Sequence, residues 1–147
     1  MITTSFLPVL RELARCYQAF EMYSAIHVRT IDLTPSQFDI VATLGNTPGM
    51  TFTQLGEKTL ITKGTLTGVV DRLTAKKLVR RIASKHDGRS QIVRLTKKGE
   101  MLFDKVFPAH LSYMGKAFAH FKTQDYARVE AALQELRNAF ESLEKQP

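Results

Sequence analysis

The chain contains a single cysteine, Cys16, which excludes an intramolecular disulfide framework. This usage is typical of proteins in a reducing, cytoplasmic setting. No apolar run approaches the roughly 18 residues that span a bilayer. The first residues also lack the basic start of a signal peptide. We therefore expect a cytoplasmic protein with no membrane partner.

Proline and glycine are sparse, with 5 and 8 residues in a chain of 147, so no linker or low-complexity tract is evident. No Gly-rich phosphate loop, carboxylate pair or nucleophile–base set stands out, so we expect neither an enzyme nor a cofactor. The histidines show no close pairing in the sequence, and no metal site is expected. These histidines are His27, His86, His110 and His120.

Acidic residues are scarce in one stretch. From Lys58 to Lys98, twelve Lys or Arg stand against two acids, Asp71 and Asp87, a net charge of +10. The whole chain carries +7, so the remainder sums to −3. An even excess of base would say little, but this segregation predicts a surface for a polyanion.

The same stretch has the periodicity of a helix-turn-helix. A short helix is expected after a cap at Thr53, ending near Lys58. A second helix is expected from Lys63 to about Lys76, with Thr62 capping its N-terminus. Its buried side recurs at i, i+3, i+4 and i+7, the pattern of a helix docked on a core. That side comprises Leu66, Val69, Val70 and Leu73.

Two β-branched runs follow, at residues 78–84 and 91–96. Asp87-Gly88 lies between them and is a hairpin signal, because glycine tolerates positive φ. We call the hairpin formed by residues 78–96 the wing. The expected fold is therefore mainly α (α+β), a winged helix-turn-helix.

Helices are expected on both sides of this lobe. The first runs from Phe6 to about Thr30. The second begins at Pro35, where Thr34 and Gln37 form a capping box, and ends near Leu44.

Beyond the wing, Thr96 caps a long helix that Pro108 should kink or split. A final helix starts near Thr123 and carries a heptad seam. This seam consists of Val129, Leu133, Leu136, Phe140 and Leu143. It needs a partner helix, either in the same chain or in a second copy. We favour the second copy, because the flanking helices carry more apolar surface than one winged helix covers.

Two segments, ITKGTLTGVVDRLTAKKLVRR and DGRSQIVRLTKKG, are the most specific part of the sequence. With them the chain resembles the MarR family (multiple antibiotic resistance regulators) over nearly its full length. The resemblance implies a homodimer that binds an inverted-repeat operator in double-stranded DNA. In many members it also implies a pocket for a small-molecule effector. The expected division is dimerisation at 1–33 and 97–147, with a DNA-binding lobe at 34–96.

On this basis Lys63–Lys76 is the expected recognition helix in the major groove, with its N-terminal half reading base edges. Arg89 is expected in the minor groove, and Asp87 either holds Arg89 or turns the hairpin. Other residues are expected on phosphates or base edges, with capping or packing as the alternative for the threonines. The full predicted set is Lys58, Thr62, Lys63, Thr65, Thr67, Arg72, Lys85, Asp87, Arg89 and Arg94. Arg72 and Arg81 have an alternative role, bridging Asp71 or a neighbouring helix.

The chain departs from the family pattern at Gly68, where many members carry Arg. Glycine removes a long donor from the groove face and costs roughly 1 kcal/mol relative to Ala within a helix. Two interpretations remain open. Recognition leans on the wing and on DNA shape, or Gly68 allows a close approach of the backbone to DNA.

The leading hypothesis is a repressor released by an aromatic or phenolic effector. Its pocket would lie between the first, second and fifth helices, lined by Tyr23 and His27 at i and i+4, although packing is the commoner role for such residues. A redox switch through Cys16, as in some members, is the first alternative. The second is a non-specific nucleoid-type DNA binder.

Overall fold

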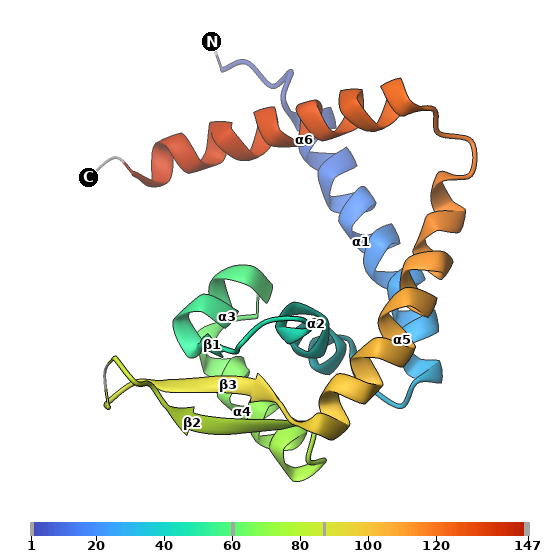
Figure 1. Ribbon diagram of the computed structural model, residues 1–147. Helices are drawn as coiled ribbons and strands as arrows, with labels where there is room; N and C mark the ends of the chain where they lie inside the picture. The colour runs from blue at the N-terminus through green and yellow to red at the C-terminus, as the bar shows by residue number, and fades with distance from the viewer. Residues whose placement is uncertain (1, 60, 87, 146–147) are drawn as a thin grey trace. The chain divides into compact units, whose positions relative to one another are not determined.

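A computed structural model describes residues 2–59, 61–86 and 88–145 (Figure 1). The chain forms two compact units, Met1–Met114 and Gly115–Pro147. The first unit comprises α1 (Leu7–Thr30), α2 (Pro35–Leu44), β1 (Met50–Thr51), α3 (Phe52–Thr59), α4 (Lys63–Ala75), β2 (Val79–Ala83), β3 (Gln91–Leu95) and α5 (Lys97–Gly115), which ends at the boundary. The second comprises a 3-10 turn, Lys116–Phe118, and α6 (Thr123–Glu144). The prediction of a mainly helical chain with a small sheet is confirmed.

Helix α2 lies at the centre of the first unit's core. Its predicted capping box is present: the Gln37 amide donates to Thr34 Oγ1, and the Thr34 amide donates to Gln37 Oε1, both at 3.2 Å. Pro35 occupies the first turn, where its missing N–H costs nothing. Ile40 and Val41 are fully buried. The local cap signal therefore fixes where this core helix begins.

Helix α3 begins at Phe52, two residues earlier than a cap at Thr53 would allow. The cap is Thr51, whose Oγ1 accepts from the Gln54 amide at 3.2 Å while its own amide donates to Gln54 Oε1 at 3.0 Å. The prediction of Thr53 was wrong because a glutamine three residues after the cap completes the pair only from Thr51. The tetrapeptides 34–37 and 51–54 share this Thr-x-x-Gln signal.

The three strands form an antiparallel sheet in the order β1-β3-β2. The register pairs Val79 with Leu95 and Arg81 with Val93. Val79, Val93 and Leu95 are buried with Leu73 of α4 in the common core. The two strands of the wing therefore pack into the same apolar core as α4.

Helix α5 is anchored to the start of β2. Thr96 caps it as predicted, since its Oγ1 accepts from the Gly99 amide at 3.1 Å. The same hydroxyl donates to the Lys77 carbonyl at 2.6 Å, and the Thr96 amide donates to the Leu78 carbonyl at 3.0 Å. A Cβ on Gly99 would lie 2.1 Å from the Leu78 carbonyl oxygen, so only glycine permits this approach.

Helix α5 continues through Pro108 to Gly115, so the predicted split at Pro108 was wrong. The neighbouring side chains are held by packing, with His110 buried and Phe107 against the core, and this offsets the lost backbone hydrogen bond. The kink at Pro108 stays a prediction. The regular helix gives way instead at Gly115, before the 3-10 turn.

Helix α6 of the second unit buries none of its residues. Its heptad seam is exposed in the single chain: Leu133 by 52%, Phe140 by 48% and Leu143 by 66%. Leu13 and Phe20 of α1 are likewise exposed. No helix in the described ranges is both long and apolar enough to cross a bilayer.

Candidate nucleic-acid interface

Helix α4 separates its residues into two faces. Leu66, Val70 and Leu73 are almost fully buried against the core. The N-terminal half of the helix exposes Lys63 and Thr65, and Thr67 is exposed one turn on. Exposed hydroxyl and ammonium groups at a helix N-terminus suit both phosphates and base edges.

Thr62 lies at the N-cap position of α4 but does not cap it with its side chain. Its hydroxyl donates instead to Thr65 Oγ1 at 3.1 Å. The prediction of a side-chain cap was therefore wrong in this respect. The Thr62 hydroxyl accepts no helix amide, while its carbonyl accepts from the Thr65 and Leu66 amides. The amides of Lys63 and Gly64, which precede them, suit an anion at this helix N-terminus.

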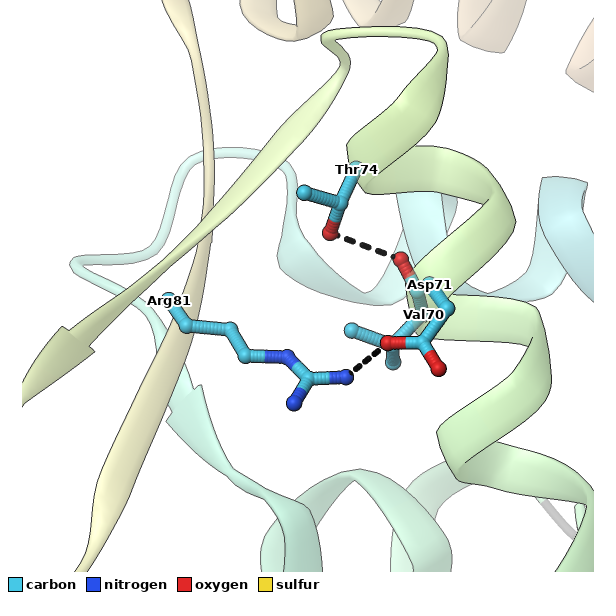
Figure 2. Close-up of polar contacts among 4 residues, drawn as sticks. All are labelled: Val70, Asp71, Thr74 and Arg81. Carbon is cyan, nitrogen blue, oxygen red and sulfur yellow. Dashed lines mark hydrogen bonds and ion pairs between the residues drawn. The ribbon is translucent and has the colours of Figure 1, made fainter.

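Asp71, the single acidic residue of α4, is paired with Arg81 of β2 (Figure 2). The Arg81 guanidinium also lies 5.1 Å from the centroid of the Phe52 ring on α3. One turn along α4, the Thr74 hydroxyl donates to the Val70 carbonyl at 2.8 Å (Figure 2). The pair neutralises the helix's one negative charge and joins α4 to the wing.

The wing carries its own basic residues. Lys85 and Arg89 are exposed, and the strands close through the Ser84 amide, which donates to the Ser90 carbonyl at 2.9 Å. Arg94 of β3 is half-buried and faces Arg80 of β2 across the ladder. Like charges directly opposite one another are unfavourable in a free hairpin, which favours an anionic partner here.

Gly68 lies on the partly exposed side of α4. A Cβ at this position would meet no atom within 4 Å, so packing does not require glycine there. Nor is its backbone in the left-handed region. The glycine therefore has no structural cause within the described chain, and both interpretations of its role at DNA remain open.

A cavity of about 640 Å³ lies within the first unit, between α1, α2, α3 and α5. Aromatic rings form part of its wall, with cationic and acidic groups from Arg29, Lys58, Glu21 and Asp39. Burial, followed by the nearby Glu21 carboxylate, raises the pKa of Asp39. The further lining residues are Tyr17, Phe20, Met22, Ser24, Ala25, Pro35, Phe38, Ala42, Thr59, Phe107 and His110.

Tyr23 of α1 and Tyr113 of α5 lie beside this cavity and form a reciprocal pair. Each hydroxyl donates to the other residue's backbone carbonyl, at 2.7 and 2.8 Å. Their rings stack with centroids 4.3 Å apart. His27 stacks on Tyr113 at 4.9 Å. These contacts hold α1 and α5 together.

His27 and His110 form a direct pair, with Nδ1 to Nδ1 at 2.9 Å. The sequence spacing gave no sign of this pair, because α1 and α5 bring together residues 83 positions apart. His110 also packs on Phe38 at 4.4 Å. Burial, followed by repulsion from His27, lowers the pKa of His110. No group of three potential metal ligands occurs among the residues the structure describes.

Comparison with known proteins decides the family. The sequence profile of the MarR family matches residues 31–90. The transcriptional regulator MhqR of Bacillus subtilis is 31% identical over 109 residues, which cover 74% of this chain and 75% of MhqR. The chain belongs to the MarR family of transcriptional regulators.

Solved structures of MarR-type regulators share the fold. Sco3205 from Streptomyces coelicolor, a MarR family regulator solved in complex with DNA, matches with a TM-score of 0.81 at 20% identity. The match covers 95% of this chain and 89% of Sco3205. NadR in complex with 4-hydroxyphenylacetate matches with a TM-score of 0.77 at 20% identity, covering 92% of this chain and 96% of NadR.

The predicted site residues lie on several helices and strands of the chain. Those on α4 and the wing are exposed, apart from the half-buried Arg94, while Asp87 lies outside the described residues. Lys58 is exposed on α3 and lines the cavity. Cys16 is an exposed free thiol on α1. Tyr23 and His27 are packed beside the cavity and are not among its lining residues.

Several residues of the cavity and of the wing were missed in the sequence analysis. His110 and Ser24 line the cavity, and Tyr113 holds α1 to α5. Arg80 was considered only for its charge. Because neighbouring residues of a strand point to opposite faces, the sequence already indicated that Arg80 and Arg81 lie on opposite faces of β2. The histidine pair had no local signal, because it depends on how two distant helices pack.

Proposed function

We propose that this protein is a repressor that binds an inverted-repeat operator as a homodimer and is released by a small aromatic effector. The observation that carries the proposal is the acid-poor surface of α4 and the wing. Asp71 is neutralised by Arg81, so the exposed groups around the N-terminal half of α4 are cationic or hydroxylic. Such a surface suits the major groove and flanking phosphates. The DNA complex of Sco3205 supports the same use of this fold.

The dimer is supported by apolar side chains that a single chain leaves exposed. The heptad seam of α6 and the outer residues of α1 need a cover, and a second copy supplies an equivalent surface by two-fold symmetry. Two copies would present two α4 helices, which an inverted repeat matches. An operator-bound dimer at a promoter would obstruct the polymerase, which is the basis for proposing repression.

The effector would occupy the cavity in the first unit. Its size suits a single aromatic ring with substituents. Phe20, Phe38 and Phe107 offer ring contacts, and Arg29 and Lys58 offer cations for a carboxylate. NadR, bound to 4-hydroxyphenylacetate, provides a precedent for an aromatic acid on this fold. We therefore propose a hydroxylated aromatic acid as the ligand class.

The release mechanism would be a shift between two states of the dimer. Ligand binding would favour a state in which the two α4 helices no longer match the half-site spacing. Helix α5 supplies a direct route, because it lines the cavity through His110 and Phe107 and begins at the end of β3.

The decisive experiment is a titration of the purified protein with the intergenic DNA beside its own gene and with scrambled DNA of equal length and composition. We expect tighter binding to the intergenic duplex, at fixed salt, and weaker binding after 4-hydroxyphenylacetate is added. Equal affinity for both duplexes would favour the non-specific alternative, whose affinity depends on salt alone. A monomer at the concentrations used would also contradict the proposal.

A redox-sensing regulator is the second candidate, favoured by the exposed thiol of Cys16. Peroxide would oxidise an accessible thiolate and release the DNA. Under this alternative, Cys16→Ser should retain DNA after peroxide treatment that releases it from the unmodified protein. If the variant still loses DNA, Cys16 is not the sensor.

A further inference from the structure

Two uncharged polar side chains meet in the cavity wall, beside the ring of Phe38. Ser24 of α1 and His110 of α5 both line the cavity, and Ser24 Oγ lies 3.4 Å from His110 Nε2. His110 is otherwise buried, with Phe38 against its ring. The polar groups at this spot are therefore the His110 Nε2 and the Ser24 hydroxyl, which suit one hydrogen-bonding group of a ligand.

The other ring nitrogen of His110 is already engaged. Its Nδ1 lies 2.9 Å from Nδ1 of His27, so one ring must donate and the other must accept. If His27 donates, His110 carries its own proton on Nε2 and presents a donor to the cavity. If His110 donates, its Nε2 becomes an acceptor, and His27 carries its proton on Nε2. While both rings are neutral, they therefore change tautomer together.

We infer that Ser24 and His110 form the subsite that binds the aromatic hydroxyl of the effector, and that this hydrogen bond selects the tautomer of His27. A phenolic O–H donates to His110 Nε2, which requires the His110 proton to be on Nδ1. That proton is donated to His27 Nδ1, so the His27 proton moves to Nε2. No charge is created, and the number of protons is unchanged. The inference rests on the proposed effector-binding function.

The surroundings support a neutral imidazole as acceptor. Burial lowers the pKa of His110, so it stays unprotonated near neutral pH and retains a lone pair for the ligand. His27 stacks on Tyr113, which exchanges hydrogen bonds with Tyr23. A change in the tautomer of His27 would therefore alter the contacts that join α1 to α5 beside the cavity.

The test compares 4-hydroxyphenylacetate with 4-methoxyphenylacetate, which lacks the donor, by calorimetry on the full-length protein. We expect at least about tenfold weaker binding of the methyl ether, since a buried acceptor is then left unpaired. His110→Leu and Ser24→Ala should reduce this preference, while His120→Leu, which changes a histidine outside the cavity lining, should retain it. Equal affinity of the two acids for the unmodified protein would overturn the inference.

A second measurement does not depend on any variant folding. In the unmodified protein with ¹⁵N-labelled histidine and saturating 4-hydroxyphenylacetate, the His27 proton should be on Nε2 and the His110 proton on Nδ1, and the methyl ether should not impose this pair of tautomers. A His27 proton on Nδ1 at saturation with 4-hydroxyphenylacetate would overturn the relay. If neither acid binds, the subsite assignment fails. Operator binding without ligand separates that failure from a failure of the DNA-binding function.

Discussion

Arg81 on β2 pairs with Asp71 on α4 while its guanidinium lies over the ring of Phe52 on α3. One side chain therefore contacts both helices of the helix-turn-helix from the wing. The side chain of Arg81 is 29% exposed and that of Asp71 is 61% exposed, so the pair is well solvated. We expect its main effect to be on the position of the wing relative to α4, because a solvated pair adds little stability.

Replacing Arg81 with alanine should therefore reduce DNA affinity more than it reduces stability. We expect the free energy of unfolding in urea to fall by about 1 kcal/mol or less. A double-mutant cycle with Asp71→Ala, measured by DNA titration, should show coupling between the two residues. Additive effects on DNA affinity would mean that the pair does not position the wing.

Replacing Arg89 with alanine should weaken operator binding by roughly 1–3 kcal/mol, as expected for loss of a groove contact. The dimer should remain folded, because Arg89 is exposed at the wing. Fluorescence anisotropy at fixed salt measures the change, and Arg128→Ala on exposed α6 is the matched control. Unchanged affinity would remove Arg89 from the interface.

Replacing Gly68 with alanine tests why glycine occurs in α4. The space for a Cβ is open, so the variant should be more stable by about 1 kcal/mol in urea unfolding. Weaker DNA binding by this more stable protein would show that the backbone approaches DNA closely at Gly68. Unchanged binding would support recognition through the wing and DNA shape.

Replacing Leu133 with lysine should separate the proposed dimer. Burial of one leucine contributes about 1.5–3 kcal/mol, and the change occurs twice in a two-fold assembly. Sedimentation velocity should show a smaller species that no longer binds the operator tightly. Glu135→Lys, which adds a lysine off the seam, should remain a dimer. Loss of the dimer in both variants would point to charge rather than to the seam.

The lowered pKa of His110 predicts a pH dependence of stability. Its folded-state pKa lies below its usual 6.5, so the unfolded chain binds the proton more readily. Stability is therefore complete above about pH 6.5 and falls as the pH drops from there toward the folded-state pKa. Urea unfolding at about pH 7.5 and pH 5.5 measures the loss, which should be smaller in His110→Leu. An equal loss in both proteins would assign it to other groups.

The local features of the fold could be predicted from the sequence. The cap at Thr34 and the docked face of α4 depend on residues within one or two turns of each other, so their patterns are complete in a short window. The cap of α3 was predicted at Thr53 and lies at Thr51, because both threonines are possible caps and only two positions separate them. The outcome depended on Gln54, which serves only the first.

The candidate site could be predicted only in part. Charge segregation marked the surface of α4 and the wing, because charge can be counted without coordinates. The partner of Asp71 had to be left open between Arg72 and Arg81, since both are within reach in the sequence; the structure selects Arg81. The pairing of His27 with His110 required α1 to pack on α5, and no pattern in either helix records that contact.

Helix α5 follows β3 with only Thr96 between them, and the close approach of Gly99 to Leu78 leaves no slack at that joint. Farther along, the same helix supplies His110 and Phe107 to the cavity. A tilt of α5 at the cavity would therefore also move the base of the wing, because no flexible linker separates α5 from β3. On the proposed function, we expect that lengthening the joint by one residue would reduce the effect of the ligand on DNA binding more than it reduces ligand binding itself.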